Sequence, residues 1–368
     1  MIYLSLFIPF ILLLIVIVMK QKFHPLMIGF LFLIPFPFIF DSCSEYSLTR
    51  QNEILGGNVL SASYFEPWDE YIHQTCTRQV NCRTDKNGST TCDTEIYDCS
   101  YVANHSEYWE LETTFGDMSC TSGEYLYLKK KFNNSNFVDM HRDFHSYDGD
   151  KYTSIWNGDS ISFEPYFMNH QYENRIQASK SIFNYEQADT IKYNLISRLV
   201  ANSGDVNSFV SNSINVSKGN STLNYYNAIF GNSKQLRMIA IVFKNQPLQI
   251  SIEQEKFWKG GNKNEFITTI GIDNDSNIVW VRNFSWIMKK ELIGTVRDEI
   301  YNMKKFDDLK IANYLGKTIP KQWKRREFKE FSYLSIDTPD SIIIWNYVLM
   351  IILSGIIFAL ILFNIDDF

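Results

Sequence analysis

Long apolar runs stand at the two ends of the chain, and the residues between them are of mixed composition. Met1–Met19 is almost uninterrupted Ile, Leu, Val and Phe; a second run covers Phe23–Phe40 and a third covers Ile342–Phe363. A helix rises about 1.5 Å per residue, so runs of about 18 to 22 residues can cross a hydrocarbon core about 30 Å thick. We therefore predict three transmembrane helices: an N-terminal hairpin in residues 1–40 and an anchor in residues 341–368.

The charges beside these runs predict an orientation. Lys20 and Lys22 stand in the tight loop between the first two runs, and cytoplasmic loops collect Lys and Arg. The body between Asp41 and Asp340 is then exoplasmic, either periplasmic or extracellular, in a multi-pass membrane protein. The basic run at residues 321–329 disagrees with this orientation, because it lies near the third apolar run on the side predicted to be exoplasmic. It suits either contact with anionic lipid headgroups or a solvated helix face.

All six cysteines lie in the first part of the body, outside the apolar runs. An even, clustered set predicts disulfide bonds in an oxidising compartment, with free thiols in a cytosolic domain as the alternative. Asn87-Gly88 indicates a hairpin turn, and a two-residue turn there sets Cys76 directly opposite Cys99. Cys82 and Cys92 miss that register by one residue, and the pair of Cys43 and Cys120 follows by elimination. The predicted pairs are Cys76–Cys99, Cys82–Cys92 and Cys43–Cys120.

Composition divides the body into two parts and predicts an α+β fold. Residues 41–188 are β-rich, and residues 221–340 alternate strands with helices. Between them, residues 189–220 form a polar connection, with a short helix followed by a stretch from about Asn202 to Asn220 that we expect to be mobile. One mixed sheet covered by helices is the economical packing for the last part. The predicted strands are Val59–Phe65, Thr75–Val80, Thr94–Val102, Glu124–Leu128, Leu236–Phe243, Glu265–Ile272 and Ile278–Val281, with helices over Lys289–Lys304 and Asp307–Tyr314.

One cluster of polar residues predicts a metal site. On a strand, Asp139, His141, Asp143 and His145 share one face, and two imidazoles beside two carboxylates suit zinc or another divalent ion. Neighbours on that face are about 7 Å apart, so only some of the four can bind the same ion. The alternative is a solvated strand face whose charges pair with nearby Arg and Lys side chains.

A second cluster predicts an anion site. Gly260 and Gly261 allow backbone N–H groups to converge on an anion, and Lys263 stands beside them. The more common role of such a glycine pair is a tight turn, and the order of a P-loop is missing.

Other features narrow the range of functions. The net charge of −6 argues against nucleic acid as a partner. The motifs G-x-S-x-G, H-E-x-x-H and G-x-G-x-x-G do not occur, so no nucleophile is paired with a base. Sequons for N-glycosylation stand at Asn87, Asn104, Asn133, Asn215, Asn220, Asn274 and Asn283.

Several stretches carry a resemblance. Tyr71–His73 through Cys99–Tyr101, Val138–Arg142, Tyr172–Arg175, Trp258–Glu265 and Glu327–Leu334 resemble a family of uncharacterised membrane proteins of phages and bacteria. This resemblance covers most of the body and implies no activity. The order strand, helix, Trp-x-Gly-Gly loop, strand and hairpin is similar to TPM domains, which are membrane-tethered α/β modules. The acidic residues typical of that family are not evident, so this similarity implies a fold and no catalytic residue.

Two classes of function fit these observations. The first is a structural or interaction protein whose disulfide-stabilised body binds another protein, or a second copy, at a cell or virion envelope. The second is a metal-dependent envelope hydrolase that uses the face of Asp139, His141, Asp143 and His145. We prefer the first, because anchors stand at both ends and no catalytic constellation is evident. It requires no cofactor, whereas the second requires a divalent metal.

Overall fold

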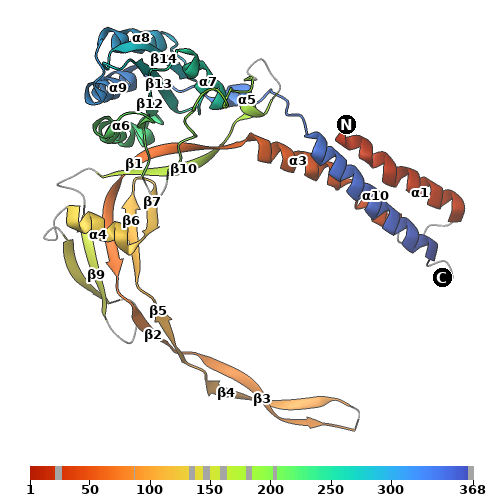
Figure 1. Cartoon of the computed structure of the whole chain (residues 1–368). Helices are drawn as coiled ribbons and strands as arrows, with labels where there is room; N and C mark the ends of the chain where they lie inside the picture. Colours follow the sequence, from red (N-terminus) through yellow and green to blue (C-terminus); the bar gives the residue numbers. More distant parts are fainter. Residues whose placement is uncertain are drawn as a thin grey trace.

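Apolar helices pack together at one end of the molecule. The computed structural model describes residues 1–20, 27–86, 88–131, 137–143, 150–157, 164–179, 185–201 and 205–363. The apolar elements are η1 (Ile2–Leu6), α1 (Phe7–Lys20), α2 (Ile28–Leu31), α3 (Pro35–Thr49) and α10 (Asp340–Phe363). Figure 1 shows the N-terminus at the end of this bundle next to the body and the C-terminus at the far end.

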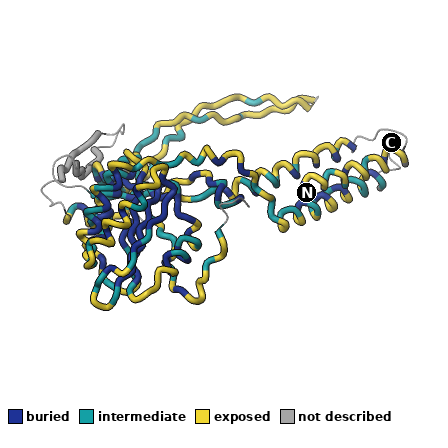
Figure 2. Tube along the Cα trace, turned by 90° about the horizontal axis from the view of Figure 1, so that it is seen from above, coloured by how far each residue is buried: buried dark blue, intermediate teal, exposed yellow. Residues whose placement is uncertain are grey.

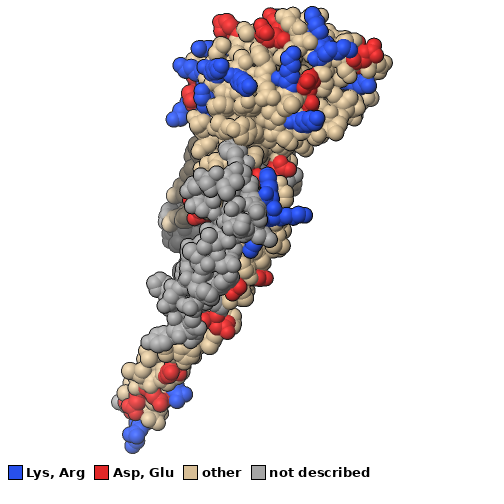
Figure 3. All heavy atoms as spheres, turned by 90° about the vertical axis from the view of Figure 1, so that its left-hand side faces the viewer, with Lys and Arg blue, Asp and Glu red and all other residues tan. Residues whose placement is uncertain are grey.

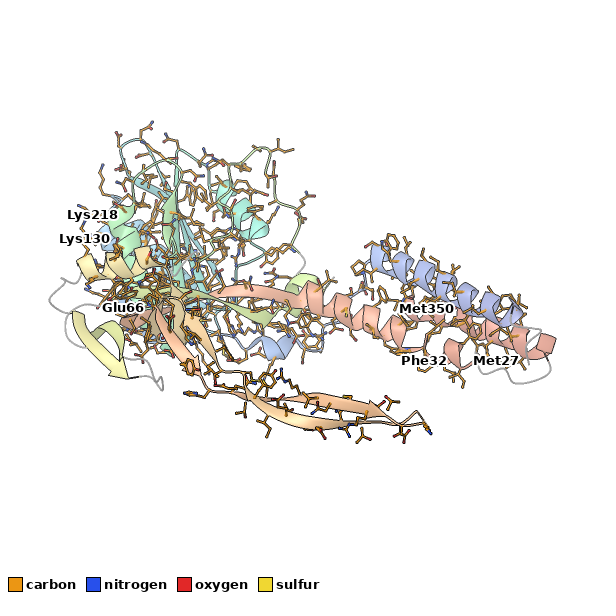
Figure 4. The ribbon with its side chains drawn as sticks, turned by 90° about the horizontal axis from the view of Figure 1, so that it is seen from below. Met27, Phe32, Glu66, Lys130, Lys218 and Met350 are labelled. Atoms are coloured by element: carbon orange, nitrogen blue, oxygen red, sulfur yellow. A yellow bond between two sulfur atoms is a disulfide. The ribbon has the colours of Figure 1, made fainter. Side chains whose placement is uncertain are left out.

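Two of the predicted membrane spans are long and apolar enough to cross a membrane. They are Ile28–Thr49 and Asp340–Leu362, whereas Ile2–Val18 is a shorter apolar helix. All three pack around a common apolar core that includes Met27 and Met350 (Figure 4). The Ser5 hydroxyl donates to Asn346 Oδ1 (2.7 Å), a buried hydrogen bond that fixes the first helix against α10.

A single long strand connects the bundle to the rest of the molecule. β1 (Arg50–Phe65) follows α3 without a break, and its first half pairs antiparallel with β10 (Pro165–Glu173). We call this pairing of residues 50–58 with 165–173 the ribbon. The second half of β1 pairs with β6 (Tyr108–Thr113) and β9 (Asp150–Asn157), with a bulge after Val59.

The second half of β1 is the centre of a lower sheet. Its order is β7-β6-β1-β9-β8, where β7 is Gly116–Cys120 and β8 is Phe137–Asp143. α4 (Ser122–Lys131) covers this sheet and buries Tyr125 and Leu128 against it. The strand predicted at residues 124–128 is therefore wrong. Thr121 and Glu124 form a capping box, in which each residue's backbone N–H donates to the other's side chain, and this motif starts a helix.

The body beyond the ribbon is an α/β unit. Its sheet has the order β11-β12-β13-β14, with the first three strands parallel and the last antiparallel. The strands are β11 (Phe209–Ser211), β12 (Arg237–Lys244), β13 (Glu265–Ile272) and β14 (Ile278–Ser285). Because strands β12 and β13 are covered on both faces, nearly all of their residues are buried.

Helices cover both faces of this sheet. α6 (Ser217–Lys234), α8 (Glu291–Asn302) and α9 (Asp308–Gln322) enclose one core, while α7 (Gln249–Phe257) and residues 193–199 enclose the other. Figure 2 shows that buried residues concentrate here. The predicted polar connection, residues 189–220, packs on the body where the structure describes it. It contributes Tyr193 and Ile196 to the second core, and it contains β11 and the start of α6.

The ribbon packs tightly on the α/β body. A Cβ atom built on Gly231 of α6 would lie 2.4 Å from backbone atoms of Gly56 in β1, so only glycine fits at this crossing. On the side nearer the apolar helix bundle, α5 (Arg175–Ala178) and η5 (Phe328–Phe331) meet in a small apolar cluster around Ile176.

Candidate functional site: the finger and the polar junction

The most distinctive feature is a disulfide-bonded hairpin that we call the finger. It consists of β3 (Thr75–Thr84) and β4 (Thr90–Asp98), and its base is the pair β2 (Trp68–Ile72) and β5 (Tyr101–His105). Two disulfide bonds hold it, with Cα–Cα distances of 5.8 Å and 4.0 Å. The predicted pairs Cys76–Cys99 and Cys82–Cys92 are confirmed.

The register of the finger differs from the prediction. Asp85 N donates to Ser89 O (2.9 Å), so three residues rather than two separate the paired ends of the turn. This turn ends in a glycine with φ of +80°, which is typical of a three-residue hairpin loop. A bulge that includes Asn81 displaces the inner pairs by one more residue, and Cys76 stands opposite Tyr97. Its bond to Cys99 is therefore diagonal across the ladder.

The third predicted disulfide is not formed. Cys43 and Cys120 are free thiols. Cys43 lies within α3 in the helix bundle, whereas Cys120 ends β7 in the lower sheet. Elimination failed because it assumed that every cysteine of an even set is paired, although the fold sends these two to different parts of the molecule.

The finger stands apart from the other described elements. β3 and β4 pair only with each other among the strands that the structure describes, and Figure 1 shows the hairpin extending away from both sheets. Ile96 is 71% exposed, and Arg78 pairs with Glu95 (2.8 Å) at the surface. Figure 3 shows charges of both signs at its tip and over the α/β body. The finger thus presents polar side chains and two open strand edges.

The loop of Gly260 and Gly261 forms a polar junction with the ribbon. The two glycines have φ of +79° and +83°, and Asn262 N donates to Glu265 Oε2 (2.8 Å). The anion beside this loop is therefore the chain's own carboxylate. Lys263 points elsewhere, with its Nζ 3.4 Å from Glu53 of β1. These contacts favour the tight-turn interpretation over an anion site at these three residues.

Asparagine side chains then join the loop to β1. Asn262 Nδ2 donates to Asn52 O (2.9 Å), and Asn264 Nδ2 donates to Ile54 O (2.8 Å). Both asparagines are buried, and Tyr172 of β10 donates its hydroxyl to Asn262 Oδ1 (3.1 Å). The loop therefore fixes the ribbon to the α/β body.

A buried ion-pair network lies behind the loop. Glu265 is 3.0 Å from Arg198 and 3.3 Å from Arg237, and the Glu265 and Arg237 side chains are almost fully buried. Burial alone would raise the pKa of Glu265, but the two guanidinium groups outweigh it and hold that pKa below its ordinary value. Burial lowers the pKa of Arg237 to about 10, so the pair is charged at neutral pH.

A second carboxylate is buried on the ribbon. Glu53 accepts from His170 Nδ1 (3.0 Å) directly across the ladder and pairs with Lys263. Burial lowers the pKa of Lys263, although Glu53 opposes this shift. The Lys263 Nζ also lies 4.3 Å from the centre of the Tyr172 ring. Sequence reasoning named Lys263 and missed Glu53, because a sequence separation of 117 lies between Glu53 and His170, its partner on β10.

The predicted metal face lies on β8 and remains a prediction. Asp139, His141 and Asp143 alternate along this strand, opposite Ser154, Tyr152 and Asp150 of β9. They therefore share one face of the strand, as the sequence pattern requires. His145 lies outside the described residues, as do the side chains of the other three. Among the side chains that the structure describes, His, Cys, Asp and Glu form no group of three suited to a metal ion.

Two further predictions can be placed. Asn283 is buried in β14 and its Nδ2 donates to Ile293 O (2.8 Å), which excludes a glycan there in the folded chain. The basic run at residues 321–329 is partly neutralised within its own segment, because Arg325 and Arg326 pair with Glu327 and Glu330.

Sequence reasoning also missed Arg198, Arg237 and Glu265. One signal was available: Arg237 is the single charged residue within the predicted apolar strand Leu236–Phe243, and a buried arginine requires a carboxylate. Comparisons with protein-family models, with curated proteins and with solved structures found no match.

Proposed function

We propose that this chain is a membrane-anchored interaction protein whose finger binds another protein at a cell or virion envelope. In this proposal the three apolar helices cross the membrane and the body lies on the exoplasmic side. One observation carries the proposal: within the described part of the chain the finger pairs with no other sheet, yet two disulfide bonds maintain it.

The energetics of the finger support this role. An isolated two-stranded hairpin is marginally stable, because it orders many residues without burying an apolar core. Each disulfide closes a loop with a sequence separation of 23 or 10 residues. Chain-entropy estimates give about 3 kcal/mol for a loop of this size, which offsets part of the ordering cost. An element stabilised in this way contributes nothing to the cores of the body, so its role lies in contacts outside the chain.

The base of the finger is suited to hold it in place. β1 runs without a break from α3, past the α/β body and into the lower sheet, and β2 and β3 follow directly. Movement of the finger relative to the helix bundle is therefore limited by the ribbon and its junction. Its charged side chains, such as Arg83 and Asp93, exclude entry into hydrocarbon and favour a polar protein surface as partner.

Site-specific photocrosslinking tests the proposal. A photoreactive amino acid replaces Ile96 on the finger, or, as a control, Val279 on β14, which is also an exposed β-branched residue (47% exposed). The full-length chain in nanodiscs is irradiated with envelope membranes from the source cells. We expect a discrete adduct from the Ile96 position, competed by unlabelled chain and absent from the control position. Equal adducts at both positions, or none at Ile96, would refute binding through the finger; an adduct of two copies would identify self-association.

A mass measurement tests the proposed compartment. Reduction of the intact chain should add four hydrogens, from two disulfides, and leave two thiols that were alkylatable beforehand. Four free finger thiols in freshly isolated native protein would contradict an exoplasmic body.

We also infer that the α/β body is related in fold to TPM domains. The parallel neighbours β12 and β13, followed by the β13–β14 hairpin, support this inference. An experimental structure of the body with a different strand order would contradict it.

A further inference from the structure

A polar cavity of about 390 Å³ lies where the ribbon, residues 198–200 and the end of α7 meet. Its lining includes Arg50, Arg198 and Lys259, and none of its lining residues is an Asp or Glu. A cavity of this size accepts a small organic ligand.

The cations at this cavity are not balanced by carboxylates. Arg50 stacks over the Tyr46 ring at 4.4 Å, and neither Arg50 nor Lys259 forms an ion pair with the residues that the structure describes. Arg198 shares Glu265 with Arg237, so these three groups together carry one net positive charge. With Arg50 and Lys259 the local charge is positive, although the whole chain is acidic. Such a field attracts anions.

Amide side chains supply the remaining polar groups. Asn52, Asn169 and Gln177 line the same cavity. Asn169 Nδ2 donates to Ala201 O (3.2 Å), which leaves its carbonyl oxygen to accept. Amides that donate and accept are suited to hydroxyl groups, whereas arginine and lysine recognise phosphate and carboxylate.

We propose that this cavity binds a small phosphorylated, hydroxyl-bearing anion through Arg50, Lys259 and Arg198. The ligand is either a soluble sugar phosphate or the headgroup of an anionic lipid. The second source is reasonable because Arg50 directly follows the helix α3. This proposal is independent of the finger and of its partner.

Binding measurements on the full-length chain test the site. Glucose 6-phosphate is titrated by calorimetry into the chain in phosphatidylcholine nanodiscs, with glucose as the uncharged probe. The variants are Lys259→Gln and Arg50→Gln, and the matched control is Lys310→Gln on the exposed side of α9. We expect binding of glucose 6-phosphate that weakens at least tenfold in the first two variants and not in the control. The affinity should also fall as salt is raised.

Native mass spectrometry separates the two sources. The chain in detergent is mixed with phosphatidylglycerol or phosphatidylcholine. Retention of phosphatidylglycerol that is lost in Lys259→Gln, without binding of glucose 6-phosphate, identifies a lipid headgroup. The proposal is overturned if neither phosphate probe distinguishes wild type from Lys259→Gln, or if glucose binds as well as glucose 6-phosphate. Should Arg50→Gln disturb the ribbon, Lys259→Gln decides alone, because Lys259 is exposed.

Discussion

Replacing Glu265 by Gln removes the negative charge from the buried network and leaves its shape almost unchanged. Arg237, whose side chain is only 2% exposed, then has no carboxylate partner. Arg198 is 34% exposed and can turn toward water, so the loss of its ion pair with Glu265 adds little to the destabilisation. Breaking a buried pair by removing one partner costs about 3–5 kcal/mol. We expect the lower end, about 3 kcal/mol, because Gln can still accept the hydrogen bond from Asn262 N.

The assay follows unfolding of the α/β body in the full-length chain. A loss of about 3 kcal/mol lowers Tm by about 6–12 °C for a unit of this size. Hydrogen exchange of β12 and β13, read by mass spectrometry, assigns the change to the body. The control is Asp298→Asn, which breaks the exposed pair of Arg297 and Asp298 and should cost less than about 0.5 kcal/mol. The double variant Glu265→Gln with Arg237→Met should recover most of the stability, since an apolar side chain needs no partner.

The pH dependence gives a second readout. The folded pKa of Glu265 lies below its unfolded value of about 4.3, so the stability from its charge is fully present above that pH. It is lost as pH falls through the folded pKa. The Tm difference between wild type and Glu265→Gln should therefore be constant near neutrality and narrow in acid. Equal effects of Glu265→Gln and Asp298→Asn at neutral pH would refute the reasoning.

Three more predictions follow from the packing of glycines and cysteines. Gly231→Ala should destabilise the chain by roughly several kcal/mol, because the new Cβ atom would clash with the backbone of Gly56. Gly294→Ala, which has open space around it in α8, should instead stabilise the chain by about 0.5–1 kcal/mol. Thermal unfolding of the two variants checks both expectations. Changing Cys82 and Cys92 to Ser should raise hydrogen exchange in the finger and leave the Tm of the body unchanged; a lower body Tm would contradict the isolation of the finger. Burial, with smaller contributions from nearby carboxylates, raises the pKa of the Cys120 thiol to about 11, so it should react with maleimide at pH 8 roughly a hundredfold more slowly than in urea; equal rates would refute this.

Local patterns in the sequence predicted much of the fold. The strand Glu265–Ile272 was placed at its observed ends, because a strand buried on both faces is rich in apolar and β-branched residues along its length. Polar composition misled the prediction for residues 202–220. That stretch contains β11 and the start of α6, where the side chain of Asn220 accepts a hydrogen bond from Ser208 N (2.7 Å). Composition does not show whether an asparagine meets water or a backbone group.

The sites differ in predictability for a related reason. The finger was predictable because its disulfides and turn lie within one short stretch of chain; the register error came from the turn length and from the bulge near Asn81, each of which shifts the pairing by one residue. The junction and the cavity were not, because they bring β1 together with residues about 150 to 210 positions later, as long-range strand packing does. The glycine pair directed attention to the correct loop, but the tertiary contacts decide the outcome. Lys263 turns to the buried Glu53, and Lys259 of the same loop lines the cavity with Arg50.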